Sequence, residues 1–395
     1  MPGFEVFGEE ERREVEEVLD TGVLFRYGFD ETRRGRWKAR EFERELGRRL
    51  GVEHCLLCSS GTAALGTALA AAGIGVGDEV VVPPFTFIAT IEAVILAGAV
   101  PLFADVDETL GLDPAAVSRA IGPRTRAVLV VHMCGSMARV DRLAEVCRER
   151  DVLLIEDTAQ AVGATLHGRP LGTFGQIGCF SFDAVKTITC GEGGAVVTPD
   201  RSLWERADQY ADHGHDHAGA NRGLDGHPIL GTNHRISELH AAVGLAQLRK
   251  LDSILATQRR HKALLEQALA GCPDVSLRAV PDPAGDSATF LTFFLPDEER
   301  ARAAARELGR AGVDGRIYWY DNNWHYIRRW EQLRGFRTAA RSPQHALELI
   351  PDFERLDLGR SDHFVGRALS LPIKLSWTPA ELARIAAGFS SVFGG

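Results

Sequence analysis

Two short stretches carry residue types that suit the binding of a charged cofactor. Ser60-Gly61-Thr62 precedes an apolar run, and free N–H groups at a helix start bind phosphate with help from the helix dipole. An ordinary helix N-cap is the other interpretation of that stretch. Asp157 ends the apolar run VLLIE, where a carboxylate needs a cation or a strong donor beside it. A protonated pyridine nitrogen would be such a partner, and a helix N-cap or a metal ligand are alternatives.

A third stretch contains Lys186, one of only five lysines, among apolar residues and ahead of a glycine-rich turn. A desolvated lysine has a lowered pKa and can form a Schiff base, whereas a surface lysine with a buried stem is the alternative. An anion cradle, a carboxylate at a strand end and a desolvated lysine are together what pyridoxal 5'-phosphate requires. The three stretches therefore predict a site for that cofactor.

The elements that must position these residues alternate between strand and helix patterns from about residue 50, which predicts βα units and a largely parallel sheet. We expect strands at 78–84, 99–106, 126–135 and 152–161, and two short strands around an irregular turn within 179–198. Helices are expected at 63–73, 87–98, 140–150 and 235–269. Ligands bind beyond the carboxyl ends of such strands, so we expect chemistry near Asp157, Gln160, His132 and the Gly61-Thr62 turn.

Length and composition limit the class of protein. The chain has 395 residues, of which 45% are hydrophobic, and it is too long to fold around a single hydrophobic core. We therefore expect a large cofactor-binding domain at 1–250 and a small C-terminal domain at 251–395. A net charge of −9 argues against nucleic-acid binding, and no apolar run is long enough for a membrane span. The acidic, amphipathic N-terminus is unlike a signal peptide, so a cytoplasmic protein with reduced cysteines is expected.

The chain resembles the nucleotide-sugar aminotransferase family, which has the aspartate-aminotransferase fold (fold type I). The resemblance implies an α/β fold: a large domain with a mostly parallel seven-stranded sheet between helices, plus a smaller C-terminal α/β domain. It also implies pyridoxal 5'-phosphate as cofactor and a homodimer with composite active sites. The motifs that carry it are SSGTAAL (59–65), GDEVVVPPFTFIAT (77–90), IEDTAQAVGA (155–164), CFSFDAVKTITCGEGGAVVT (179–198) and GTNHRISELHAAVGLAQL (231–248).

The resemblance also implies a role for each matching residue. Lys186 matches the lysine that holds the cofactor aldehyde and moves the substrate proton, and lysine rather than histidine there favours transamination over dehydration. Asp157 matches the carboxylate on the pyridine nitrogen, Gln160 a residue near the ring and its 3-hydroxyl, and Phe87 the aromatic stacked on the ring. Phosphate contacts are expected from Ser60, Gly61, Thr62 and Ser181, and from Asn233 toward the phosphate of the neighbouring subunit.

Stretches outside the cofactor motifs resemble the branch of this family that makes 8-amino-3,8-dideoxy-manno-octulosonate (8-amino-Kdo). That resemblance implies L-glutamate as amino donor, with 2-oxoglutarate as its product, and a sugar-acid-like carbonyl acceptor. An arginine-rich composition equally suits a relative that aminates another carbonyl compound in specialised metabolism; a dehydratase and a non-catalytic sensor are further alternatives. The shared stretches are MPGFEVFG (1–8), FRYGFD (25–30), VHMCGSMA (131–138), DHGHDH (212–217) and WYDNNWHY (319–326).

Five residues are candidates for contacting substrate. Arg26 suits a carboxylate of the acceptor and Arg235 a carboxylate of glutamate. His132 ends an apolar strand and faces either the substrate or the core. Tyr320 and Asn322 belong to an aromatic, amide-rich segment that forms either a lid or a core strand. We expect no metal site, because no cysteine or carboxylate pattern completes the alternating histidines His213, His215 and His217, which fit a polar loop near the active site.

Overall fold

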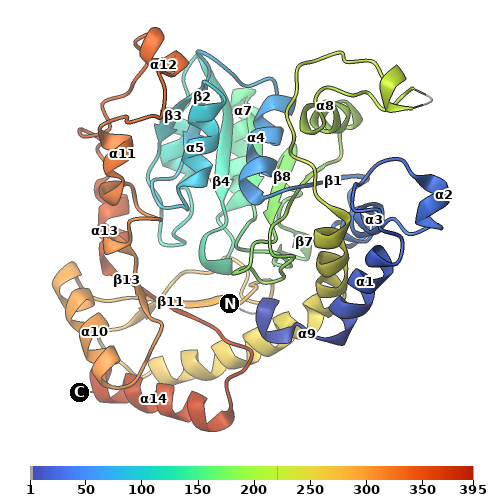
Figure 1. Cartoon of the computed structure of the whole chain (residues 1–395). Helices are drawn as coiled ribbons and strands as arrows, with labels where there is room; N and C mark the ends of the chain where they lie inside the picture. Colours follow the sequence, from blue (N-terminus) through green and yellow to red (C-terminus); the bar gives the residue numbers. More distant parts are fainter. Residues whose placement is uncertain (1–2, 220, 395) are drawn as a thin grey trace.

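Apolar runs rich in valine form the centre of a seven-stranded sheet in the computed structural model, which describes residues 3–219 and 221–394 (Figure 1). Strand β9 is antiparallel to both of its neighbours, and the other pairs are parallel. The predicted mostly parallel sheet is therefore confirmed. In spatial order its strands are β1 (His54–Cys58), β9 (Gly194–Thr198), β8 (Ile177–Ser181), β5 (Leu153–Asp157), β4 (Thr125–Val131), β2 (Glu79–Val82) and β3 (Val100–Phe103).

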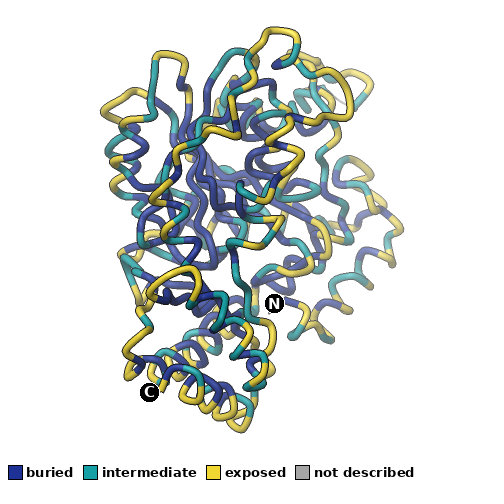
Figure 2. Tube along the Cα trace, turned by 90° about the vertical axis from the view of Figure 1, so that its left-hand side faces the viewer, coloured by how far each residue is buried: buried dark blue, intermediate teal, exposed yellow. Residues whose placement is uncertain are grey.

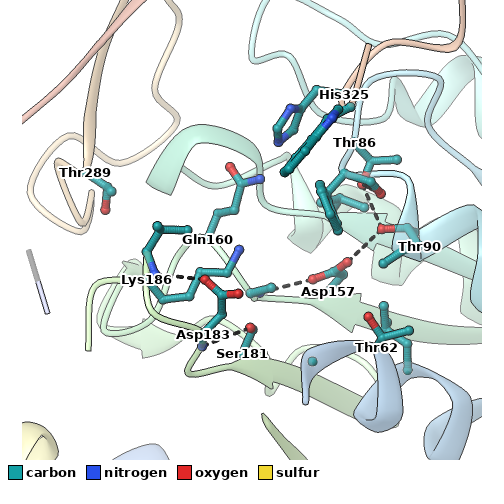
Figure 3. Close-up of a pocket in the computed structure, with 18 of the residues that line it drawn as sticks. Thr62, Thr86, Thr90, Asp157, Gln160, Ser181, Asp183, Lys186, Thr289 and His325 are labelled. Carbon is teal, nitrogen blue, oxygen red and sulfur yellow. Dashed lines mark hydrogen bonds between the residues drawn. The ribbon is translucent and has the colours of Figure 1, made fainter. Parts of the chain in front are cut away.

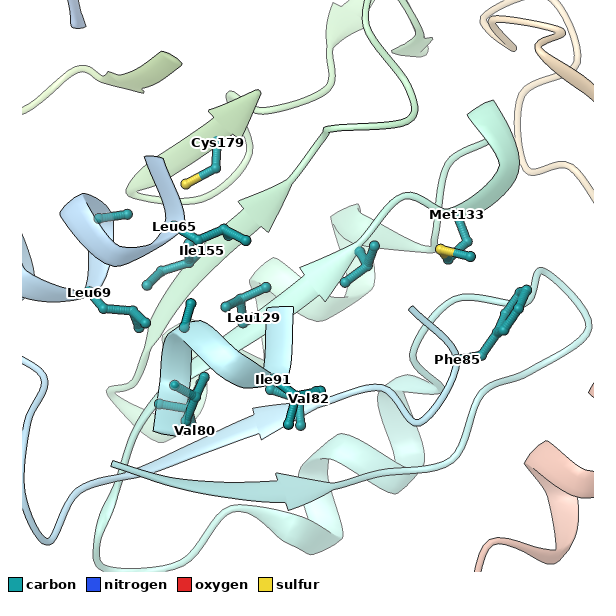
Figure 4. Packing of buried hydrophobic residues seen from close by; sticks show 14 of the residues in the cluster. Leu65, Leu69, Val80, Val82, Phe85, Ile91, Leu129, Met133, Ile155 and Cys179 are labelled. Atoms are coloured by element: carbon teal, nitrogen blue, oxygen red, sulfur yellow. The ribbon is translucent and has the colours of Figure 1, made fainter. Parts of the chain in front are cut away.

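Helices cover both faces of this sheet because successive strand side chains point to opposite faces. Val80 and Val82 pack with one set of helices (Figure 4). Val81 packs with the other set. The buried strands lie in the interior of the molecule, and exposed residues lie on the outer helices and loops (Figure 2). One face is covered by α4 (Gly61–Ala71), α5 (Ala89–Leu96) and α8 (Arg201–Ala211), the other by α3 (Lys38–Leu50), α6 (Pro114–Ala120), α7 (Val140–Arg150) and α9 (Glu238–Leu269).

A second, antiparallel sheet follows in the chain and has its own apolar cluster with the end of α9. Helix α9 crosses residue 250 without a break, so the division of the chain there stays a prediction. Phe290 and Trp319 belong to the apolar cluster of the large sheet, so the two sheets are joined by packing. The second sheet has the order β10 (Ser276–Leu277), β11 (Phe290–Phe294), β13 (Ala368–Pro372) and β12 (Ile317–Tyr318), with α10 (Glu298–Arg310) and α14 (Pro379–Phe393) beside it.

The remaining elements are short or lie at the edges. In the described part of the chain, no helix has the length and apolar character that crossing a membrane requires. All seven cysteines are buried and unpaired. The elements are η1 (Gly3–Val6), α1 (Glu9–Leu19), α2 (Asp30–Arg33), η2 (Met133–Gly135), β6 (Thr165–Leu166), β7 (Arg169–Pro170), η3 (Arg222–Leu224), η4 (Trp319–Asp321), η5 (Ile327–Arg329), α11 (Glu331–Arg334), α12 (Pro343–Ala346) and α13 (Gly359–Arg367).

Candidate active site

A cavity of about 270 Å³ lies where the parallel strands end, as expected for an open α/β sheet. Figure 3 shows Lys186, Asp157 and Gln160 around one space, with Ser181 and Thr62 at its base. Among the predicted residues, the structure brings together Ser60 and Asn322, which lie 262 positions apart in the chain. The predicted residues that line this cavity are Ser60, Gly61, Thr62, Phe87, Asp157, Gln160, Ser181, Lys186 and Asn322.

The start of α4 forms the base of the cavity. Ser60 caps the helix, because its Oγ accepts the N–H of Ala63 at 3.0 Å. It also lines the cavity, so the cap and the cradle are one structure rather than alternatives. A Cβ on Gly61 would lie 2.7 Å from the Cβ of Ser181, so only glycine lets the helix start this close to the end of β8. The helix N-terminus there suits an anion.

Asp157 ends β5 and is buried. Its Oδ1 accepts the N–H of Ala159 at 3.1 Å, and its Oδ2 accepts the hydroxyl of Thr90 at 2.9 Å. Burial raises the pKa of Asp157, and these two hydrogen bonds oppose the rise because they favour the ionised form. Thr90, whose hydroxyl lies 2.8 Å from that of Thr86, was not among the predicted site residues although it lies in the motif at 77–90. Its position on α5 opposite a strand end gave no sequence signal.

Lys186 lies in the irregular turn between β8 and β9, which the sequence predicted. The turn is closed by the N–H of Lys186, which donates to the carbonyl of Asp183 at 3.0 Å. The N–H of Gly3 donates to the carbonyl of Lys186 at 3.2 Å, so the N-terminal stretch supports this turn; Met1 and Pro2 of the same stretch lie outside the described residues. Burial lowers the pKa of Lys186, although Asp157 and Asp183 oppose it. A lowered pKa favours the neutral, nucleophilic amine.

Gln160 is oriented by a backbone group. Its Oε1 accepts the N–H of Cys134 at 2.9 Å, so the amide nitrogen is the end left to donate into the cavity. Cys134 has φ +55° within the turn η2, a left-handed conformation that is uncommon for a non-glycine residue. The stretch at 131–138 thus acts on the site through Cys134.

Two of the predicted substrate residues are corrected by the structure because they are buried away from the cavity. His132 is fully buried, with Nε2 3.1 Å from Glu156 Oε2 and Nδ1 accepting the N–H of Ala138, so it is a core histidine. Arg26 is also buried, and its guanidinium donates to the carbonyl of Leu57 at 3.0 Å and to Glu43 Oε1 at 2.7 Å. Both side chains serve packing and pairing, which the apolar pattern around them did not reveal.

Tyr320 is also corrected, because it lies in a separate surface hollow beside Asp362, with its hydroxyl 3.4 Å from Asp362 Oδ1. The segment at 319–326 therefore lines the cavity with only part of its residues. Among these, Asn322 was predicted, whereas Trp319, Trp324 and His325 were missed despite lying in the same quoted stretch.

Asn233 is exposed and Arg235 is half-buried, and neither lines the cavity of its own chain. Arg235 Nη1 pairs with Asp212 at 2.5 Å, and Arg222 donates to the same carboxylate. The roles expected of Asn233 in a neighbouring subunit and of Arg235 toward glutamate stay predictions. Asn233 forms an isolated β-bridge with Asp212, and Arg235 forms an ion pair with the same residue. Asp212 directly precedes the segment that carries the three histidines.

The histidine segment is a turn rather than an extended run, because His213 and His217 have φ of +56° and +52°. The rings of His215 and His217 are stacked within this turn, with ring centres 6.1 Å apart. His215 Nδ1 lies 3.1 Å from Asp225, and the ring of His217 stacks on Tyr27 at 4.4 Å between ring centres. Within residues 3–219 and 221–394, no group of three histidine, cysteine or carboxylate side chains is arranged to hold a metal ion.

The residues of the cavity fit pyridoxal 5'-phosphate. A glycine-requiring helix start suits the phosphate, a buried carboxylate suits a protonated ring nitrogen, and an amine of lowered pKa suits the aldehyde. Phe87 lines the same cavity and supplies an aromatic face. The donor set therefore matches each charged or reactive end of the cofactor.

Comparisons with known proteins agree with this fit. The model of the DegT/DnrJ/EryC1/StrS aminotransferase family matches residues 6–390. L-glutamine:2-deoxy-scyllo-inosose aminotransferase of Streptomyces kanamyceticus is 40% identical over 68% of this chain and 67% of the relative. 3-Amino-5-hydroxybenzoate synthase of Amycolatopsis mediterranei is 36% identical over 79% of this chain and 80% of the relative. With two other relatives, the match spans 61% or 62% of the relative's length.

The same fold is present among solved structures. The crystal structure of 3-amino-5-hydroxybenzoic acid synthase matches with a TM-score of 0.81 and 31% sequence identity, over 98% of this chain and 97% of that one. The shared arrangement extends over both sheets, because the match covers nearly the whole of each chain.

Proposed function

The chain belongs to the DegT/DnrJ/EryC1/StrS aminotransferase family and is a pyridoxal-phosphate-dependent aminotransferase, and from that premise we propose that it moves the amino group of L-glutamate onto a carbonyl of a sugar-acid-like acceptor. One observation carries the proposal: the amine of Lys186 and the carboxylate of Asp157 line the same cavity at the strand ends. The proposal places the reaction in the cytoplasm, where thiols such as the seven unpaired cysteines stay reduced.

The chain's own residues divide the chemistry between them. When bound, the cofactor supplies an electron-accepting ring that stabilises negative charge on the reacting carbon. Lys186 moves the proton between substrate and cofactor at Nζ, which its lowered pKa permits. Asp157 binds the protonated ring nitrogen, and Thr90 and Ala159 keep that carboxylate in place. L-glutamate leaves as 2-oxoglutarate in the first half of the reaction, and the acceptor carbonyl receives the amino group in the second.

The donor half is tested by the absorbance spectrum of the cofactor-loaded protein before and after L-glutamate, with Lys186→Ala beside it. We expect the yellow band to disappear in the wild type as 2-oxoglutarate forms, whereas the variant should form no 2-oxoglutarate. L-glutamine is tested in parallel, because one relative bears that donor in its name. A band that neither amino acid changes would contradict the proposal.

Two classes of acceptor are proposed. The 8-amino-Kdo type is supported by the stretch at 319–326, which lies outside the cofactor motifs and still lines the cavity. A carbonyl compound of an antibiotic pathway is supported by relatives at 36% to 40% identity that are named for 2-deoxy-scyllo-inosose and for 3-amino-5-hydroxybenzoate.

The reaction run in reverse separates these two acceptors. Protein supplied with 2-oxoglutarate and either 8-amino-Kdo or 2-deoxy-scyllo-inosamine should form L-glutamate faster with the amine that corresponds to its own product. Equal, background rates with both amines would exclude these two amines as products of a glutamate-dependent reaction. The Lys186→Ala protein measures that background.

We also propose a homodimer in which Asn233 of one copy completes the phosphate cradle of the other. Asn233 is exposed and does not line the cavity of its own chain. Lys186→Ala and Asn233→Ala should each lose activity, and their subunits should then complement each other when the two proteins are mixed after mild dissociation. About half of the dimers would then be mixed, and each mixed dimer would have one intact site out of two. Mixing would therefore restore about a quarter of the wild-type activity. No recovery on mixing, with mixed dimers present, would contradict a shared site.

A further inference from the structure

His325 is a half-buried residue in the wall of the cavity that the sequence did not single out. Its ring lies between Phe87 and Trp319, with ring centres 5.5 Å and 4.9 Å away. The backbone is held as well, because the N–H of Thr86 donates to the carbonyl of His325 at 3.0 Å and that of Ile88 to the carbonyl of Trp324 at 3.1 Å. Figure 3 shows His325 across the cavity from Lys186 and beside Gln160. The imidazole is therefore fixed over the reacting space.

The neighbours of His325 determine which ring nitrogen carries the proton. The N–H of Trp324 donates to Asn322 at 2.9 Å, which identifies the amide atom as the oxygen Oδ1. The same oxygen lies 2.9 Å from Nδ1 of His325, so Nδ1 must donate. Nε2 then has a lone pair, and no group in the described residues hydrogen-bonds to it. Burial and the charge of Lys186 lower the pKa of His325 to about 4, so the ring is neutral at physiological pH.

We propose that His325 determines specificity for the acceptor: its Nε2 accepts a hydrogen bond from a hydroxyl group next to the acceptor's carbonyl. The site then selects hydroxy-aldehydes and hydroxy-ketones, a class that includes sugars and cyclitols. This inference rests on the transamination proposed above, and it identifies the hydroxyl group next to the carbonyl as the part of the acceptor that the protein recognises. An acceptor without the hydroxyl leaves Nε2 without this partner, which disfavours that acceptor. L-glutamate has no hydroxyl, so the donor half does not depend on Nε2.

Asn322 is a positioning residue in this arrangement, since it acts on the acceptor only through His325. Its side-chain oxygen holds the proton of the imidazole on Nδ1 and so keeps Nε2 free to accept. The charged groups that line the same cavity are Lys186, Asp157, Asp183 and Glu192. Lys186 is the one among them whose charge shifts the pKa of His325.

The test compares two probes that differ by one hydroxyl, glycolaldehyde and acetaldehyde. The protein is loaded directly with pyridoxamine 5'-phosphate, so the acceptor half is measured without any amino donor. In single turnovers, the wild type should prefer glycolaldehyde by roughly 10- to 100-fold more than the free cofactor does in buffer. His325→Phe should remove that preference, and His325→Gln should restore part of it because its amide can accept near Nε2. His363→Phe, at an exposed histidine, is the matched control and should keep it.

An equal preference in the wild type and in His325→Phe would overturn the proposal, as would a wild type that prefers neither probe. Failure of the donor half is a separate result: the probes would still be distinguished, but L-glutamate and L-glutamine would not charge the protein. The two hypotheses therefore fail in different measurements.

A second measurement does not depend on turnover. Nitrogen NMR of the cofactor-loaded protein, with His325→Gln used to assign the signal, should show the proton on Nδ1 and no titration between about pH 6 and pH 8. Asn322→Asp places a carboxylate on Nδ1 and should raise the pKa of His325. Nε2 then becomes protonated as the pH falls through that pKa, and the preference for glycolaldehyde should fall with it. A wild-type proton on Nε2 would overturn the proposal.

Discussion

The two sides of the cavity are built in different ways. We call Gly61, Asp157, Ser181 and Lys186 the floor, and Phe87, Trp319, Asn322, Trp324 and His325 the wall. The floor comes from the ends of neighbouring strands and from the turns that follow them, where strand register sets each position. Much of the wall comes from a segment more than 130 residues beyond Lys186, held by backbone hydrogen bonds to residues 86 and 88.

This difference separates two tasks. The floor matches groups that every turnover uses, namely a phosphate, a ring nitrogen and an aldehyde. The wall contacts whatever is brought to the cofactor, and its polar groups lie on a segment whose sequence can change without altering strand pairing. Substitutions in the floor should therefore damage both halves of the reaction, whereas substitution of the wall residue His325, which the donor does not need, should damage mainly the acceptor half.

The largest effect is expected from Lys186→Ala, which removes the amine from the floor. Turnover should fall by at least about 10⁴-fold, because both the nucleophile and the proton carrier are lost. The rate of 2-oxoglutarate formation measures it, and Lys374→Ala, at an exposed lysine, is the control. A Lys186→Ala protein that keeps the wild-type rate would refute the assignment.

Asp157→Ala should retain the cofactor and slow both halves by on the order of 100-fold, because the ring nitrogen loses its charged partner. Single-turnover rates with donor and with acceptor measure the two halves separately. If only the acceptor half slowed, Asp157 would act like a wall residue, and the floor would not serve both halves of the reaction.

Gly61→Ala should weaken cofactor binding by roughly 10-fold or more, because its Cβ would meet Ser181 at 2.7 Å and overpacking costs about 1–3 kcal/mol. Gly66→Ala is a matched control in the same helix, where the nearest atom is 3.7 Å away. Alanine there should raise stability by up to about 1 kcal/mol. Cofactor retained on dilution and thermal unfolding measure the pair, and equal effects of the two variants would argue against a cradle at Gly61.

Thr90→Val should have the smallest effect. Removing the hydroxyl takes away a hydrogen bond that favours ionised Asp157, so the pKa of Asp157 should rise further. Asp157 is active when ionised, so the acid limb of kcat/KM should move to higher pH, with a change of a few-fold at neutral pH. An acid limb that does not move would show that Thr90 does not act through Asp157.

Much of the floor was predictable from the sequence. An apolar run, a carboxylate at its end and a lone lysine before a glycine-rich turn are local patterns, and the structure gathers them as parallel strands must. The large sheet followed for the same reason, since β-branched runs alternating with helices specify βα units. The division at residue 250 was less predictable, because one continuous helix serves both sheets.

Phe87 and Asn322 of the wall were predicted, but Trp319, Trp324 and His325 were not, and neither were the roles of the buried polar residues. His132 and Tyr320 have the residue types of a site, but whether a side chain faces a cavity depends on neighbours distant in sequence, here Glu156 for one and Asp362 for the other. His325 carried no local signal either, because its proton is positioned by Asn322 and its ring by Phe87 and Trp319.

By itself, the sequence determined the fold, the cofactor and the residues of the floor, because strand patterns and their end residues are written in short, contiguous stretches. Tertiary structure alone decided which polar side chains reach the cavity and which are buried in pairs. That choice depends on packing between segments far apart in the chain, which no local periodicity encodes.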